Sequence, residues 1–133
     1  MSKPVVLVIE DNEPTRILYS EELSYAGYEV LTAKTGQEGL DILQQQPVDL
    51  VVLDIAMPGM DGVEALGKIL SINKQLPVIL NTAYSSYKDD FMTWAAEAYV
   101  VKSSDLTELL TEVAKALKSR GIEPPPLPEP VED

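Results

Sequence analysis

The segment LVVLDIAMPGMDG, residues 50–62, joins a short apolar run to a carboxylate. The run from Leu50 to Leu53 is typical of a strand that is buried on both faces, as in a parallel sheet. An acid at the end of such a strand is unexpected, because a buried carboxylate is costly unless it is paired. The proline and glycines that follow serve a turn. The segment therefore predicts a buried strand that presents Asp54 for a chemical task.

Four further apolar runs alternate with segments that have helical spacing. The runs are Val5 to Ile9, the weaker Tyr28 to Ala33, Val78 to Leu80, and Ala98 to Val101. The helical segments are about 14–25, 37–45, Val63 to Leu70, Phe91 to Ala95, and Leu106 to Leu117. Strict alternation predicts an α/β domain: a doubly wound, five-stranded parallel sheet with helices on both faces, as in flavodoxin-like folds.

Length and composition predict one domain followed by a tail. The chain has 133 residues, of which 45% are hydrophobic, and this is enough for one domain with a proper core. Residues 1–120 hold all the expected elements. Residues 121–133 include five prolines and four acids, so we expect this tail to be extended or disordered.

Composition also excludes several function classes. The chain has no cysteine and no histidine, which excludes disulfides, thiolate sites and histidine-based catalysis by this chain alone. A net charge of −12 disfavours direct binding to nucleic acid. No apolar run approaches the ~20 residues that span a bilayer, and no signal-peptide layout is present. We expect no membrane contact and a cytoplasmic location.

Polar residues follow the expected strands at the edge where ligands bind in open parallel sheets. They are Glu10 and Asp11 after the first strand, Asp54 after the third, Asn81 and Thr82 after the fourth, and Lys102 after the fifth. Three neighbouring carboxylates repel one another unless a hard cation joins them, and Mg²⁺ prefers such oxygen ligands. The set predicts a Mg²⁺ site where Asp54 attacks a phosphoryl group, with Thr82 and Lys102 as donors to its oxygens.

These motifs resemble the receiver domains of bacterial two-component response regulators, of the single-domain, chemotaxis-regulator-like kind. The match covers about Lys3 to Leu117. The motifs are Glu10-Asp11 after VVLVI, LDIAMPGMDG around Asp54, Thr82-Ala83 after VILN, and Lys102 three residues after Tyr99. Each motif alone is weak, but together they occur in order at the expected strand ends.

The resemblance implies how the site would hold its cofactor and its phosphoryl group. Asp54 would be the phosphoacceptor, with a histidine of a sensor kinase or phosphotransfer protein as donor. Asp11 and Asp54 would bind Mg²⁺ directly, Glu10 mainly through water, and Ala56 through its backbone carbonyl. Lys102 would pair with a phosphoryl oxygen.

The resemblance also implies a switch rather than an enzyme in the usual sense. Thr82 would move to meet the phosphoryl group, and Tyr99 would turn into the space that Thr82 leaves. The output surface would comprise the helix around Phe91 to Ala95, the strand Ala98 to Val101 and the last helix. The downstream protein target is not identified by the sequence. We expect a monomer or weak dimer.

Three positions depart from the family's usual pattern or bear on phosphate lifetime. Ser103 stands where receivers usually have proline, so the resemblance does not define the loop after Lys102. Ala56 and Tyr84 flank the path of hydrolytic water by resemblance, which points to an altered phosphate lifetime.

Some of the same residues also fit other interpretations. Singly, Glu10-Asp11 reads as a helix cap, Thr82 as a strand former, Lys102 as a surface lysine and Tyr99 as core. A degenerate receiver, acting as a constitutive interaction module, has Ser103 as its only support. A dehalogenase-like phosphatase needs a second acid at Ala56, and a dinucleotide domain needs a glycine-rich loop that VIEDNEPT lacks.

Overall fold

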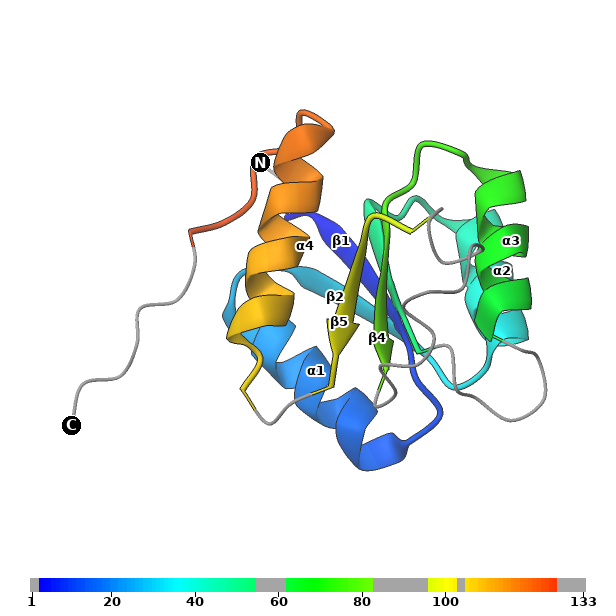
Figure 1. Ribbon diagram of the computed structural model, residues 1–133, viewed down its shortest axis with the longest axis horizontal. Coiled ribbons are helices and arrows are strands. Elements are labelled where there is room, and N and C mark those ends of the chain that lie inside the picture. The colour runs from blue at the N-terminus through cyan, green and yellow to red at the C-terminus, as the bar shows by residue number, and fades with distance from the viewer. Residues whose placement is uncertain (1–2, 55–61, 83–95, 103–104, 127–133) are drawn as a thin grey trace.

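A computed structural model of the chain describes residues 3–54, 62–82, 96–102 and 105–126 (Figure 1). Its strands are β1 (Val5–Ile9), β2 (Glu29–Ala33), β3 (Leu50–Leu53), β4 (Val78–Thr82) and β5 (Ala98–Val101). Its helices are α1 (Glu13–Tyr25), α2 (Gly36–Gln45), α3 (Gly62–Ile72) and α4 (Thr107–Ser119). The helix expected around Phe91 to Ala95 lies outside the described residues.

The strands form one parallel sheet in the order β2-β1-β3-β4-β5. Strand β2 therefore lies on one side of β1 and β3 on the other, and the direction of winding reverses between β1 and β3. Ile9 is paired with Ala33 on β2 and with Leu53 on β3, so these strand ends are level with one another. The predicted doubly wound sheet is confirmed, and its ligand-binding edge lies beyond the ends of β1 and β3.

Helices cover both faces of the sheet, as predicted. Figure 1 shows α1 and α4 on one face and α2 and α3 on the other. Successive residues of a strand point to opposite faces, and β1 follows this rule throughout. Val6 and Val8 pack toward α1 and α4, whereas Leu7 and Ile9 pack toward α2 and α3. Two apolar cores, one on each face, hold the strand ends in place.

Glycines end α1 and α4 in the same way. Gly27 has φ +106° and Gly121 has φ +76°, which only glycine adopts without strain. The residue after Gly27 donates its N–H to the carbonyl of Leu23 at 3.1 Å, and the residue after Gly121 donates to that of Leu117 at 3.0 Å. This is the hydrogen-bond pattern of a Schellman cap. It confirms that Gly27 ends the first helix.

The first residues of the expected tail lie against the domain. Ile122 packs against the apolar core beneath α1 and α4. Pro125 lies so close to Gly27 that a Cβ on this glycine would be 2.8 Å from the proline Cβ. Residues 127–133 lie outside the described residues, so the domain boundary at residue 120 and the disorder of the tail stay predictions.

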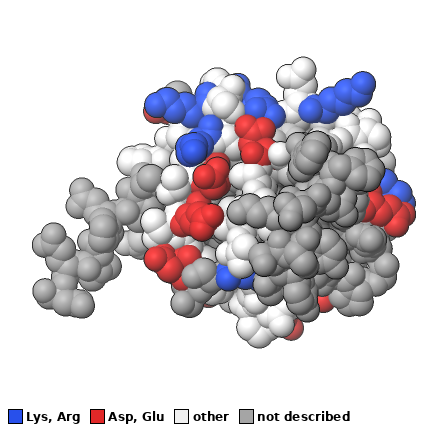
Figure 2. Space-filling view, in the orientation of Figure 1, with Lys and Arg blue, Asp and Glu red and all other residues white. Residues whose placement is uncertain are grey.

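Charged side chains follow the polarity of α4. Figure 2 shows basic side chains near the end of this helix and acidic ones along its first half. Glu108 lies in the first turn and Lys118 in the last, an order that complements the helix dipole. Within the described ranges, no helix is long and apolar enough to cross a membrane.

Candidate functional site

The structure brings the three predicted acids together at the ends of β1 and β3. One carboxylate oxygen from each of Glu10, Asp11 and Asp54 lies within 4.8 Å of the other two. The backbone N–H of Asp54 donates to the carbonyl of Ile9 at 3.1 Å, which ties the end of β3 to the end of β1. Glu10 and Asp54 are 2% and 5% exposed, whereas Asp11 is open to solvent.

Lys102 lies between two of these acids. Its Nζ is 2.5 Å from Glu10 Oε1 and 3.0 Å from Asp54 Oδ2. The contact with Glu10 Oε1 is an ion pair without the alignment of a hydrogen bond. The backbone N–H of Lys102 also donates to the carbonyl of Thr82 at 2.7 Å, so the end of β4 places the lysine. The structure thus brings Lys102 together with Glu10 and Asp54.

Burial and charge act against each other in this cluster. Burial raises the pKa of Glu10, and the nearby Asp54 raises it further, while Lys102 and the N–H of Asn12 lower it. Burial also pushes the pKa of Lys102 down, but its close contacts with the carboxylates of Glu10 and Asp54 outweigh this, and the net shift is upward. Lys102 therefore stays an ammonium ion beside the carboxylates at neutral pH.

The donor set fits a hard divalent cation. Three carboxylates and one ammonium carry formal charges of −3 and +1, which leaves −2 among these four side chains. One Mg²⁺ would balance that charge. Oxygen ligands with an open side for water are what this ion requires, and Asp11 provides the open side. Ala56, whose backbone carbonyl completes the predicted ligand set, lies outside the described residues.

The two predicted switch residues lie on neighbouring strands. Thr82 is fully buried as the last residue of β4, and Tyr99 is half-buried on β5, where it is paired with Leu80. Tyr99 packs against the apolar core beneath α2 and α3. Leu80 and Thr82 are two residues apart on one strand and so point to this same face of the sheet. Ser103 and Tyr84 lie outside the described residues.

Three residues near the site received no role from the sequence. Arg16 Nη1 donates to the backbone carbonyl of Glu10 at 3.0 Å. Tyr19 and Asn81 are 3% and 2% exposed, and the tyrosine hydroxyl donates to Asn81 Oδ1 at 2.9 Å. An asparagine next to the apolar run of β4 was the one visible signal, since a buried amide needs a partner.

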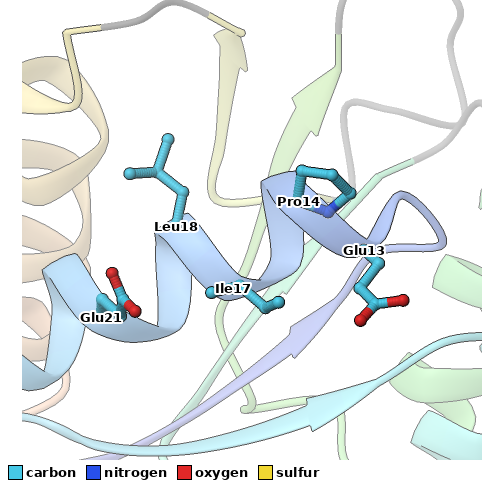
Figure 3. A pocket seen from close by; sticks show the side chains of 5 residues that line it. All are labelled: Glu13, Pro14, Ile17, Leu18 and Glu21. Atoms are coloured by element: carbon cyan, nitrogen blue, oxygen red, sulfur yellow. The ribbon is translucent and has the colours of Figure 1, made fainter.

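An exposed apolar surface on α1 borders the site. Figure 3 shows the five side chains that line a shallow pocket there, namely Glu13, Pro14, Ile17, Leu18 and Glu21. Ile17 and Leu18 are 48% and 41% exposed. The helix begins at Glu13, two residues after Asp11, so this α1 surface adjoins the acidic cluster.

Comparison with known proteins shows the family to which the chain belongs. The family model of the response regulator receiver domain matches residues 6–114. The chain belongs to this family. Receiver domains are the signalling switches of two-component systems.

Two curated relatives from Bacillus subtilis are similar to most of this chain. Sporulation initiation phosphotransferase F is 33% identical over 119 residues, which cover 88% of this chain and 96% of the relative. The uncharacterized transcriptional regulatory protein YkoG is 37% identical over 123 residues, covering 91% of this chain and 54% of the relative. The receiver thus spans about half the length of YkoG and almost all of the phosphotransferase.

Two solved structures of the response regulator TrrA from Thermotoga maritima resemble the receiver closely. TrrA in complex with Mg²⁺-BeF has a TM-score of 0.83 and 45% identity, covering 86% of this chain and 99% of TrrA. TrrA in complex with the histidine kinase ThkA has a TM-score of 0.81 and 45% identity, covering 86% and 98%.

Proposed function

We propose that Asp54 accepts a phosphoryl group in a Mg²⁺-dependent reaction and that the receiver thereby changes the surface it offers to other proteins. The observation that carries this proposal is the cluster itself. Glu10, Asp11 and Asp54 gather at the point where the winding of the sheet reverses, with the ammonium of Lys102 against two of them. The complex of TrrA with Mg²⁺-BeF supports the same use of the site.

The reaction transfers a phosphoryl group from an imidazole nitrogen of the donor to a carboxylate oxygen of Asp54. A carboxylate oxygen of Asp54 forms a bond to phosphorus while the bond from phosphorus to the donor's imidazole nitrogen breaks, and that nitrogen keeps the electron pair. Mg²⁺ would neutralise charge on the attacking and transferred oxygens. Glu10 and Asp11 would hold the cation beside Asp54.

Two further residues stabilise the phosphorylated state. Lys102 exchanges part of its contact with Asp54 for a phosphoryl oxygen, which it reaches from its place beside both acids. The hydroxyl of Thr82 donates to a second phosphoryl oxygen. Tyr99, on the neighbouring strand, then turns into the space that Thr82 leaves. This pair biases a two-state equilibrium, and the preferred state exposes a different surface to a downstream protein.

The phosphoryl donor is a sensor histidine kinase or a phosphotransfer protein. The complex of ThkA with TrrA supports this class of partner. The apolar α1 surface, with Ile17 and Leu18 exposed beside the acids, is placed for the donor to rest on while its imidazole reaches Asp54. The proposal includes a cytoplasmic location, as the resemblance to receivers implies, and a switch that turns over no separate substrate. The alternative, a constitutive interaction module, is not favoured, because the acceptor, the acids and the lysine are all present.

Acetyl phosphate tests the proposal without a kinase. We would incubate the chain with acetyl phosphate, with and without Mg²⁺, and measure its intact mass. We expect one added phosphoryl group that requires Mg²⁺ and is absent in Asp54→Asn. Asp41→Asn is the matched control, because Asp41 is an exposed acid on α2 whose carboxylate accepts a hydrogen bond from Gln37, four residues earlier.

A second variant tests the role of Lys102, which assists phosphorylation but does not accept the phosphoryl group. Lys102→Ala should slow phosphorylation while the protein stays folded, whereas Lys34→Ala, an exposed lysine on the segment after β2, should not. An adduct that persists in Asp54→Asn would show that another residue is the acceptor. No adduct and no Mg²⁺ binding in the folded wild type would overturn the proposed function.

A further inference from the structure

One buried polar contact interrupts the apolar layer between the sheet and α1. Of the residues of β4 that point toward α1 and α4, Ile79 is apolar and Asn81 is not. Asn81 accepts a hydrogen bond of 2.9 Å from the hydroxyl of Tyr19, which lies 62 positions earlier on α1. Both side chains are at least 97% buried. Because both side chains are almost fully buried, the loss of either partner leaves the other polar group poorly satisfied.

This contact lies directly beside the site. Asn81 precedes Thr82, the proposed donor to a phosphoryl oxygen, and its Cα is paired with Val100, two residues before Lys102. Burial raises the pKa of Tyr19, so its hydroxyl remains a neutral donor, and the charges of Lys102 and Glu10 are close enough to act on it. An all-apolar pair would fill the same layer without the desolvation of two polar groups.

The hydroxyl of Tyr19 belongs to a helix that is anchored twice. Three residues earlier, Arg16 Nη1 donates to the backbone carbonyl of Glu10 at the end of β1. The helix α1 therefore holds the strand end that carries the metal-binding acids at one point and the strand end that carries Thr82 at another. Leu18, next to Tyr19, is exposed on the α1 surface.

We infer that Tyr19 and Asn81 form a positioning pair, which holds the end of β4 so that the hydroxyl of Thr82 meets the phosphoryl group on Asp54. The inference rests on the proposed function and adds a residue pair to it. Neither side chain touches the reacting atoms. Their contribution is to orientation, because displacement of a donor by a fraction of its hydrogen-bond length weakens its effect on the transfer step.

Three variants separate positioning from packing. Tyr19→Phe removes only the hydroxyl, Asn81→Leu removes only the amide, and the double variant makes the layer apolar throughout. Each single change leaves one buried polar group without its partner and lowers the melting temperature. The double variant recovers most of this loss, because neither polar group then remains.

In the double variant, the rate of phosphorylation by acetyl phosphate should stay low even though the melting temperature recovers. In the double variant and in Tyr19→Phe, we expect the rate at saturating Mg²⁺ to fall roughly five-fold. The dissociation constant of Mg²⁺ should stay within about two-fold of the wild type, since the acids belong to β1 and β3. Tyr28→Phe is the matched control, because Tyr28 is equally buried in the same apolar core but directly precedes β2, which β1 and β3 separate from β4.

The outcomes decide between the two levels of the proposal. A double variant that is phosphorylated as fast as the wild type would show that the pair only packs, and would overturn this inference alone. Parallel loss of Mg²⁺ affinity and rate would overturn it too, because that result indicates a general loosening of the site. A folded wild type that takes no phosphoryl group at Asp54 would overturn the proposed function and this inference with it.

Discussion

Lys102 has two effects on the site that act in opposite directions. Its ammonium stabilises Glu10 and Asp54 while no cation is bound, but it also repels a cation that the same acids would bind. We predict that Lys102→Gln binds Mg²⁺ several-fold more tightly, because the formal charge of the four side chains changes from −2 to −3. Phosphorylation should slow in the same variant.

Calorimetric titration with Mg²⁺ measures the affinity of the Lys102→Gln variant for the cation, and the reaction with acetyl phosphate measures its phosphorylation rate. Lys34→Gln provides the control for a lost surface charge. Weaker Mg²⁺ binding in Lys102→Gln would show that the lysine organises the acids rather than competing with the cation.

Tyr28 reports on alkaline stability at a distance from the site. Burial raises the pKa of Tyr28 from 10.0 to about 12. Its neutral form is favoured in the folded protein, so its contribution is complete below pH 10 and is lost as the pH rises from 10 toward 12. Tyr28→Phe cannot ionise, and its free energy of unfolding should fall by about 2 kcal/mol less than that of the wild type over this range.

Urea unfolding at pH 8, 10 and 11.5 measures this difference. Tyr25→Phe is the control, since Tyr25 is 83% exposed. Equal pH dependence in Tyr28→Phe and the wild type would show that the phenol reaches water in the folded protein.

Helix α2 approaches β1 so closely that one position requires glycine. A Cβ on Gly39 would overlap Cδ1 of Ile9 and lie 2.8 Å from its Cγ1. Ile9 is fully buried, so its side chain has little room to swing aside, and the resulting strain falls on the residue that directly precedes Glu10. We predict that Gly39→Ala destabilises the protein by about 1–3 kcal/mol and weakens Mg²⁺ binding.

Gly67 offers the opposite case on α3. A Cβ there would meet no atom of the described residues within 4 Å, so Gly67→Ala should stabilise the protein by about 0.5–1 kcal/mol through helix propensity alone. Chemical denaturation of both variants checks the pair. A Gly39→Ala protein that is as stable as the wild type would contradict the close packing of α2 on β1.

The elements were predictable because their signals are local. Continuous apolar runs predicted β1, β3 and β5 at the residues where the structure has them, and Gly27 predicted the end of α1. The last helix differs slightly from expectation. It begins at Thr107, and the carboxylate of Asp105 accepts the N–H of Thr107 at 2.9 Å from outside the helix.

Contacts between distant elements were not predictable from one sequence. Periodicity indicates which side of a strand is buried but not which helix residue lies opposite, so the bond from Tyr19 to Asn81 has no local signal. The convergence of the acids and Lys102 was predictable for a different reason. Every parallel strand delivers its following residue to the same edge, whatever the order of the strands.

The whole molecule is strongly acidic, and this affects its response to ions. The net charge is −12, and its excess negative charges repel one another in the compact fold. Added salt of any kind screens this repulsion, so it should stabilise the fold somewhat. Mg²⁺ should do more, because it binds the folded site and raises the free energy of unfolding by about 2–3 kcal/mol at one hundred times its dissociation constant.

Melting temperatures in MgCl₂ and in NaCl of equal ionic strength separate the two effects. The melting temperature should be higher in MgCl₂ than in NaCl, and this difference should shrink in Asp54→Asn, which removes one ligand charge. Equal melting temperatures in the two salts would show that the acids do not bind the cation in the folded protein.

The course of the chain after α4 has a practical use. Ile122 and Pro125 carry the backbone from the end of α4 to the turn at Gly27, which lies at the amino edge of the sheet. The acids lie at the carboxyl edge, on the far side of the molecule. A fluorescent reporter or surface tether joined after Pro126 would therefore leave the edge that carries the acids unobstructed. The domain could be immobilised there as a sensor element while its chemistry proceeds undisturbed.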